Sequence, residues 1–371
     1  MSKLIDKIKR NIPVPAIVLF VLAFISGIIH VICLISVKFA DFYNQYPGAF
    51  VRGALAKITG ILPFSLAETI VLSIPVFIFI FIMIARRFFK RGNTDANRCI
   101  WGLVSVVALM YSLFVLGYGM GYNGSPLSEK LGLEEKAVSK EELVDTINWL
   151  NEETEDCLDG IVYSDSGRSY MEYSLGELND KLLDAYDKAC DKYTFIQRIR
   201  TVVKPVALSD LMAYTHISGL YSYYTGEANI LTVFPDYSLP YTMAHELAHQ
   251  RGIAPENEAN FVAFLVCLES DDPYIKYSGC VSVLEYLFNA LYSADSDLYY
   301  ETVTKVDLRI RKEISAFSSF FDKYRDSTAS KIADTVNDTY LKLQGQKAGT
   351  KSYGLVVDLA VAYYKSVSNA G

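Results

Sequence analysis

Charged residues are scarce in this sequence, and no two of its cysteines have the close C-x-x-C spacing. Only 21% of the 371 residues are charged and 51% are hydrophobic, which is unusual for a soluble protein of this size. The chain has no internal repeat and no low-complexity tract. None of its six cysteines forms a C-x-x-C pair. Three disulfide pairings are therefore open to Cys157, Cys190, Cys267 and Cys280. Free buried thiols are an equal alternative.

Negative charge is nearly missing from the first third of the chain. Residues 1–120 contain 12 Lys and Arg against 4 Asp and Glu, a net charge of +8. Residues 121–371 contain 23 against 38, a net charge of −15. This asymmetry predicts two parts in two environments. The acidic second part argues against nucleic acid as a partner, because phosphate binding needs a basic surface.

Three stretches of the first third contain no charged side chain: 11–37, 69–85 and 99–128. Each is close to or above the roughly 20 residues that cross a lipid bilayer as a helix. We therefore predict a transmembrane region over residues 1–121, with helices at about 12–37, 66–85 and 99–121. The first stretch is longer than the apolar part of a signal peptide, so we interpret it as a retained anchor.

Lysine and arginine set the expected orientation. They gather before the first helix and between the second and third, at 86–98, and are sparse over 38–65. The positive-inside rule then places the N-terminus in the cytoplasm and residues 122–371 outside the cell membrane of a multi-pass protein. We expect His30, inside the first helix, to be a buried and hydrogen-bonded residue of the helix bundle.

Helical patterns dominate residues 122–371. Amphipathic spacing predicts helices over 139–157 and 174–190, the first opened by a capping box of Ser139 and Glu142, and a short helix over 208–215. Aromatic and β-branched residues broken by Gly and Pro predict strands over 217–235. Helices follow to the end of the chain. The expected fold of this part is mainly α with a small sheet and a C-terminal helical part.

Histidine is rare, with 4 residues in the chain, yet His245 and His249 lie four apart in the segment YTMAHELAHQRGIAPENEAN. On a helix they share one face, about 6 Å apart along the axis, so both rings can reach one Zn²⁺. Glu246 then projects beside the metal, where a general base must lie. Zinc lowers the pKa of water toward about 7, and the glutamate takes its proton as it attacks a carbonyl.

A catalytic zinc needs a third protein ligand and one open position. Gly252 ends the histidine helix, and Pro255 opens the next. Glu256 and Glu258 both follow, but they point about 200° apart on a helix, so only one of them can bind the metal. Residues alone leave this choice open.

The motif pair H-E-x-x-H and E-x-x-A-N resembles that of gluzincin-type metallopeptidases. The resemblance implies that Glu256 is the third ligand and that Asn260 supports a ligand histidine. The loop from His249 to Glu256 is shorter than in most of those enzymes, so Glu258 stays an alternative.

A wider resemblance covers most of the chain. The membrane-helix leader, SGLYSYYTGEAN (218–229), HELAHQRGIAPENEANFVAFL (245–265) and NDTYLKLQGQKAGTKSYG (337–354) are similar to bacterial membrane proteins grouped as domain of unknown function 3810. That group is regarded as zinc metallopeptidases. The resemblance implies a zincin-like α+β catalytic domain over 122–371, with no known substrate.

The predicted strand before the histidine helix fits this expectation, since such a strand borders the cleft and pairs with an extended peptide. A tyrosine hydroxyl could stabilise the oxyanion. We name Tyr223 as the candidate, with Tyr221, Tyr224, Tyr340 and Tyr353 as open alternatives. His216 is a weaker candidate for the site, and Glu227 and Asn229 fit a turn as well as a functional role.

Two functions compete at this point. The first is a membrane-anchored zinc metalloendopeptidase that cleaves a peptide or protein near the membrane, with Glu246 as general base. The second is a non-catalytic receptor or scaffold with a structural zinc site. Glu246 favours the first, because a structural site needs no base and usually has four protein ligands. An intramembrane protease is disfavoured, because the motif lies well beyond the last apolar stretch and has polar flanks.

Overall fold

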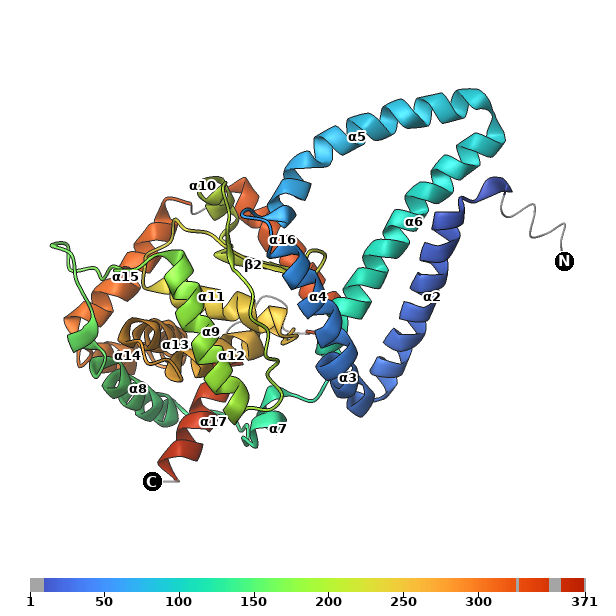
Figure 1. Ribbon diagram of the computed structural model, residues 1–371. Coiled ribbons are helices and arrows are strands. Elements are labelled where there is room, and N and C mark those ends of the chain that lie inside the picture. The colour runs from blue at the N-terminus through green and yellow to red at the C-terminus, as the bar shows by residue number, and fades with distance from the viewer. Residues whose placement is uncertain (1–9, 325–326, 347–354, 370–371) are drawn as a thin grey trace. The chain divides into compact units, whose positions relative to one another are not determined.

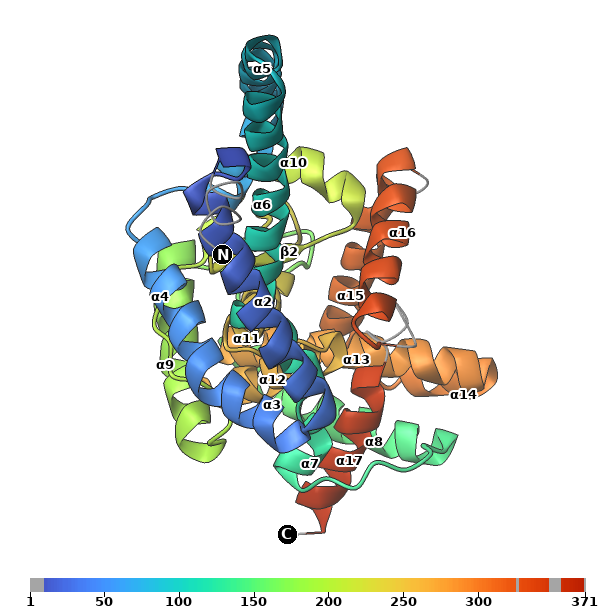
Figure 2. The ribbon, with the colours of Figure 1, turned by 90° about the vertical axis from the view of Figure 1, so that its right-hand side faces the viewer.

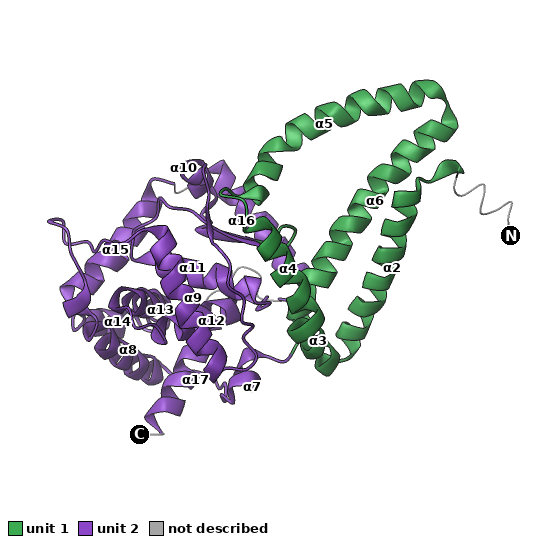
Figure 3. Ribbon diagram, viewed as in Figure 1, with its two compact units in different colours: residues 1–124, 222–226 green, residues 125–221, 227–371 purple. Residues whose placement is uncertain are grey.

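The chain folds as two units, which Figure 3 distinguishes by colour. The computed structural model describes residues 10–324, 327–346 and 355–369. Unit 1 comprises residues 1–124 and 222–226, and unit 2 comprises residues 125–221 and 227–371. Each unit has its own apolar core.

The charge-free stretches of unit 1 form long helices, α2 (Val14–Ile35), α5 (Leu66–Arg91) and α6 (Asn93–Gly117). All three are long and apolar enough to cross a membrane, which confirms the prediction of three such helices. None of the residues of α5 is buried within the protein, as expected of a helix whose apolar side chains face lipid. Figure 1 shows α2 and α6 side by side, and the ring nitrogen Nδ1 of His30 lies 3.2 Å from the Tyr111 hydroxyl across that contact.

The basic segment over 86–98 is not the loop that we expected. Helix α5 continues through its arginines to Arg91, and α6 begins at Asn93, so only Gly92 separates the two helices. Gly92 has φ +121°, which favours glycine. Arg and Lys are good helix formers and are favourable near a helix C-terminus. Helix α5 therefore continues beyond the charge-free stretch 69–85 to Arg91.

The connection over 38–65 also contains structure that the sequence analysis missed. It forms α3 (Val37–Tyr43), the π-helical turn η1 (Asn44–Gly48) and α4 (Ala49–Thr59), and the short helix η2 (Gly119–Asn123) follows α6. Arg52 of α4 is buried and donates hydrogen bonds to the Gly117 carbonyl at 3.0 Å and to Asn44 Oδ1 at 2.9 Å. These acceptors stabilise the buried cation.

Unit 2 opens with four short to medium-length helical elements. They are α7 (Leu127–Leu131), α8 (Lys140–Glu155), η3 (Leu158–Gly160) and α9 (Leu175–Lys192). The predicted capping box of Ser139 and Glu142 is present, and Ser174 and Glu177 form a second one on α9. The short helical stretch expected over 208–215 is α10 (Ser209–Met212) followed by η4 (Ala213–Thr215).

The small sheet has three strands in the order β1-β3-β2. Its strands are β1 (Lys204–Pro205), β2 (Gly219–Ser222) and β3 (Glu227–Ile230), with β1 parallel to β3. The region 217–235 therefore contains strands as predicted, whereas the two-residue β1 was missed. β2 lies at an edge of this sheet.

The centre of unit 2 is a group of buried helices, α11 (Ser238–Gln250), α12 (Glu256–Leu268) and α13 (Pro273–Ala294), which contact one another. Every residue of α12 from Ala259 to Cys267 is buried. The remaining helices are α14 (Ser296–Val303), α15 (Leu308–Asp322), α16 (Thr328–Leu343) and α17 (Val356–Ser368). Helix α15 contacts α13, and Figure 2 shows both helices. All six cysteines are free thiols, which settles the pairing question.

Candidate metal centre

A tight turn between α11 and α12 builds the centre. Gly252, with φ +88°, ends α11, and its backbone N–H donates to the His249 carbonyl. Pro255 is extended and precedes the first residue of α12, Glu256. Because only residues 251–255 separate the helices, the first side chain of α12 returns to the last turns of α11.

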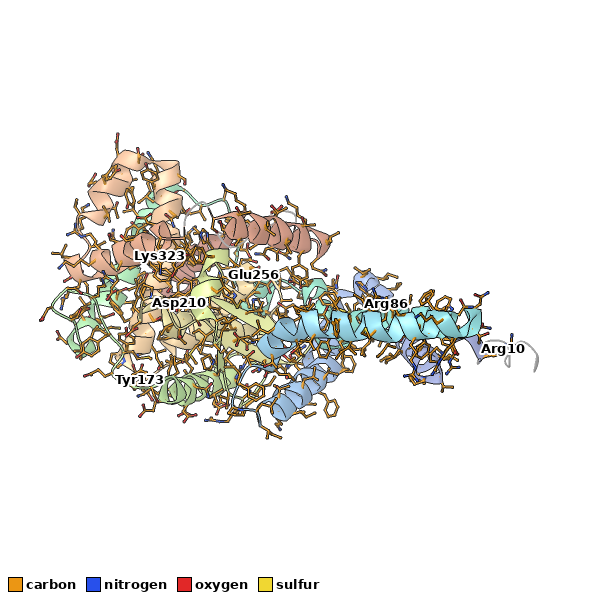
Figure 4. All side chains as sticks on the ribbon, turned by 90° about the horizontal axis from the view of Figure 1, so that it is seen from above. Arg10, Arg86, Tyr173, Asp210, Glu256 and Lys323 are labelled. Atoms are coloured by element: carbon orange, nitrogen blue, oxygen red, sulfur yellow. The ribbon has the colours of Figure 1, made fainter. Side chains whose placement is uncertain are left out.

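Three side chains meet at this crossing. The Nε2 atoms of His245 and His249 lie 3.2 and 3.3 Å from the same oxygen, Oε2 of Glu256. The two rings are nearly perpendicular, with centroids 4.5 Å apart, and one potential ligand atom from each residue lies within 4.8 Å of the others. The side chains are only 6–12% exposed, and Figure 4 shows Glu256 among the side chains of unit 2. This buried group could hold one metal ion.

The backbone orients the second histidine. The Nδ1 atom of His249 lies 2.7 Å from the Ile253 carbonyl and donates its proton there, which directs Nε2 toward Glu256. Among the described residues, Nδ1 of His245 has no hydrogen-bond partner. Two imidazoles and one carboxylate are a ligand set that suits zinc and also iron(II), so the geometry defines a metal site without selecting the metal.

The electrostatics of the three groups are strongly coupled. Burial alone would raise the pKa of Glu256, but the adjacent His249 and His245 outweigh it and hold that pKa well below its ordinary value. Burial would lower the pKa of His249, but the Glu256 carboxylate outweighs it and raises that pKa to about 9. Without a metal, the site is therefore held together by an ion pair that a divalent cation would replace.

Glu246 projects from the same helix toward strand β2. Burial raises the pKa of its carboxyl group, although a hydrogen bond from the Tyr221 backbone and the two histidines oppose the shift. Its Oε2 atom is buried without a hydrogen-bond partner among the described residues. The carboxylate packs directly on Gly219, where an added Cβ atom would lie 2.6–2.9 Å from it. Glycine at this position is what lets the carboxylate and the strand approach each other.

A cavity of about 440 Å³ opens beside the centre. His245 and Glu246 lie on one side of it, Tyr286 and Glu285 come from α13, and Asp334 comes from α16. Its volume is within the range of pockets that bind small ligands.

The structure separates the two candidate third ligands. Glu256 joins the histidines, whereas Oε1 of Glu258 accepts a hydrogen bond from the Leu127 backbone at 3.0 Å. Asn260 places its Nδ2 atom 3.4 Å from the Tyr286 hydroxyl, and its carbonyl accepts from Tyr241, while its expected support of a ligand histidine stays a prediction. Asn260 lies one turn along α12 from Glu256, and this contact joins it to α13.

The tyrosine named for the oxyanion lies in unit 1. The Tyr223 ring stacks on Tyr118 at 5.4 Å and meets Phe114 edge-on at 5.2 Å. Its catalytic role stays a prediction. Of the alternatives, Tyr221 is buried on β2, Tyr224 belongs to unit 1, Tyr340 lies on α16, and Tyr353 is outside the described residues.

The weaker candidates have distinct positions. His216 lines the cavity, and its Nε2 lies 3.1 Å from the Tyr324 carbonyl. It is the one non-glycine residue with positive φ, +59°, in the described part of the chain, a conformation that carries strain. Glu227 is buried, and its carboxylate lies 3.5 Å from the ammonium of Lys204. The Asn229 side chain donates a hydrogen bond to the Leu220 carbonyl, so both residues support the sheet.

Two residues of α13 in the cavity wall escaped the sequence analysis, Glu285 and Tyr286. Burial raises the pKa of the Tyr286 hydroxyl, which therefore stays protonated and able to donate. Both lie in a mostly apolar segment that the sequence presents as an ordinary buried helix. Only an acidic residue inside an otherwise apolar helix could have drawn attention to them.

The fold and the site together define a membrane-helix protein with a buried His-His-Glu group in a second, mainly helical unit. The chain belongs to the family described as Protein of unknown function (DUF3810), whose pattern matches residues 42–361. No curated protein and no solved structure matches the chain.

The contact between Gly219 and Glu246 yields a direct test. Gly219→Ala should lower the stability of the detergent-solubilised full chain by about 1–3 kcal/mol, because the new methyl overlaps the carboxylate. Gly176→Ala, where an added Cβ atom meets only Ser174 Oγ at 3.8 Å, should be neutral or slightly stabilising in thermal unfolding. Adding Glu246→Ala should recover much of the loss in a double-mutant cycle. Equal unfolding midpoints for both glycine variants would contradict this packing.

Proposed function

We propose that this protein is a membrane-anchored zinc metallopeptidase whose active site is the centre on α11 and α12. The observation that carries the proposal is the combination of three buried ligand groups with a fourth residue, Glu246, which lines the adjoining cavity and whose Oε2 has no hydrogen-bond partner in the described part of the chain. A site of three protein ligands leaves a coordination position open, which is typical of catalytic zinc.

In this proposal His245, His249 and Glu256 hold the metal. When bound, a zinc ion supplies Lewis-acid chemistry, because it acidifies water and polarises the carbonyl of a peptide bond. Glu246 accepts a proton from the attacking water and passes it to the leaving amine, so the peptide bond is replaced by a carboxylic acid and an amine. The burial that raises the pKa of Glu246 makes it a stronger base than an exposed carboxylate.

Two further elements suit a peptide substrate. Strand β2 is an edge of the sheet, and its Gly219 packs on Glu246, so an extended peptide added to β2 would run past the base. Tyr286 lines the same cavity and keeps its hydroxyl proton, which makes it our preferred donor to the developing oxyanion.

The competing proposal is a receptor or scaffold with a structural metal. A fourth protein ligand would favour it, since structural zinc sites are closed. The described residues offer only one group of three, and a carboxylate base beside it has no purpose in a structural site. These features support the peptidase.

Variants of the full-length protein separate these functions. Glu246→Gln should keep about one zinc per chain but lower kcat/KM for peptides at least about 100-fold, because the base is lost and the ligands remain. His249→Ala should lose both zinc and activity. Glu258→Gln serves as control on the same helix and should change neither, since Glu258 bonds Leu127 instead of the metal group. Zinc content and hydrolysis of a peptide library are the measurements. Unchanged activity in Glu246→Gln would favour a structural site.

We also propose that unit 2 faces outside the cell and that the N-terminus is cytoplasmic. The basic residues at the junction of α5 and α6 support this orientation through the positive-inside rule. A cysteine introduced at Asn93, in a chain whose own cysteines are replaced, should resist a membrane-impermeant thiol reagent in intact cells, whereas one at Lys188 on α9 should react. The opposite pattern would reverse the orientation.

A further inference from the structure

The cavity contains a carboxylate that the proposed reaction does not use. Glu285 lies on α13 in the cavity wall and, among the described residues, makes no hydrogen bond and no ion pair. Burial raises its pKa to about 7, and no cation or donor opposes the shift. Two buried carboxylates of unit 2 that lie outside this cavity are satisfied: Glu227 pairs with Lys204, and Glu313 accepts from the Ser169 backbone.

The surroundings of Glu285 are aromatic and acidic. Tyr237, Tyr241 and Tyr286 line the same cavity as Glu285. Burial raises the pKa of each hydroxyl, and the charge of Glu285 adds to that shift. No lysine or arginine is among the described residues that line the cavity, whereas Asp334 adds a second carboxylate from α16. Glu285 is half-buried, and a carboxylate partly removed from water without a partner is unfavourable, so this wall would gain from a cation brought by a ligand.

We propose that Glu285 forms a subsite that binds a basic side chain of the peptide substrate, lysine or arginine, in the cavity next to the scissile bond. The inference rests on the proposed peptidase function and names its substrate class. An ammonium or guanidinium group would form charge-assisted hydrogen bonds to Glu285. The tyrosine rings would pack on the methylene stem of the side chain and contact its cationic head.

The first test compares matched peptides on the zinc-loaded full-length protein. Each peptide of a series has one lysine, and its partner has norleucine, which keeps the stem and lacks the ammonium group. The wild type should cleave the best lysine peptide at least about tenfold faster, by kcat/KM, than its norleucine partner. This comparison requires no variant, so a folding defect cannot obscure it.

The second test assigns the preference to Glu285. Glu285→Gln should abolish the lysine preference while hydrolysis of the norleucine peptide changes by less than about threefold. Asp334→Asn, a carboxylate of the same cavity on a more exposed helix face, is the matched control and should keep most of the preference. Calorimetry on the inactive Glu246→Gln variant measures binding of the two peptides without turnover. The ratio of the norleucine-peptide Kd to the lysine-peptide Kd should match the preference seen in kcat/KM, and adding Glu285→Gln should abolish it.

The outcomes distinguish the two proposals. If the wild type cleaves peptides without preferring lysine or arginine, or if the preference survives in Glu285→Gln, the subsite is overturned and the peptidase stands. If the wild type neither cleaves nor binds any peptide of the series, the proposed function fails and the subsite falls with it. Loss of the preference in Glu285→Gln alone supports the inference.

Discussion

The contact of one carboxylate with two imidazoles at the crossing of α11 and α12 is the constraint on which the site depends. Glu256 begins α12, and the turn at Gly252 returns it to the histidine face of α11. Burying these groups is favourable only when their charges are compensated, by one another or by a metal ion. The geometry of the turn therefore decides both the stability of this region and its capacity to bind a metal.

Contacts of α11 with α9 and with the segment before β1 hold the histidine helix in place. Arg251, at its C-terminal end, is buried and donates to the carbonyls of Leu247 and Ile199, while its guanidinium stacks on Tyr186 at 3.7 Å. The Tyr186 hydroxyl donates to the Ala244 carbonyl at 2.6 Å. These contacts tie α9 to the side of α11 that faces away from the ligands, and they satisfy carbonyls at the helix end. Residues beside the HExxH motif are thus structural supports of it.

Local rules predicted much of this structure from the sequence. The three charge-free stretches, the capping box at Ser139 and the glycine stop at Gly252 each act through neighbouring residues, so a sequence pattern reports them directly. The spacing of His245 and His249 predicted a shared face for the same reason, and the structure places their rings together.

Features that depend on packing between distant segments could not be predicted. The choice of Glu256 over Glu258 needed the contact of Glu258 with Leu127, 131 residues away. The direction of the Asn260 side chain depends on α13, and so does the presence of Tyr286 in the cavity. The helices over 38–65 are held by buried groups such as Arg52, whose acceptor on Gly117 is 65 residues away in sequence. The two-residue strand β1 exists only because β3 pairs with it.

X-ray absorption at the zinc edge of the full-length, zinc-loaded protein tests the central claim most directly. The account predicts two imidazole nitrogens and carboxylate or water oxygens at about 2.0–2.2 Å, with no sulfur near 2.3 Å, and a changed spectrum in Glu256→Gln but not in Glu258→Gln. A sulfur ligand, or a spectrum that Glu256→Gln leaves unchanged, would mean that the metal binds elsewhere, and the centre on α11 and α12 would then be only a buried ion pair.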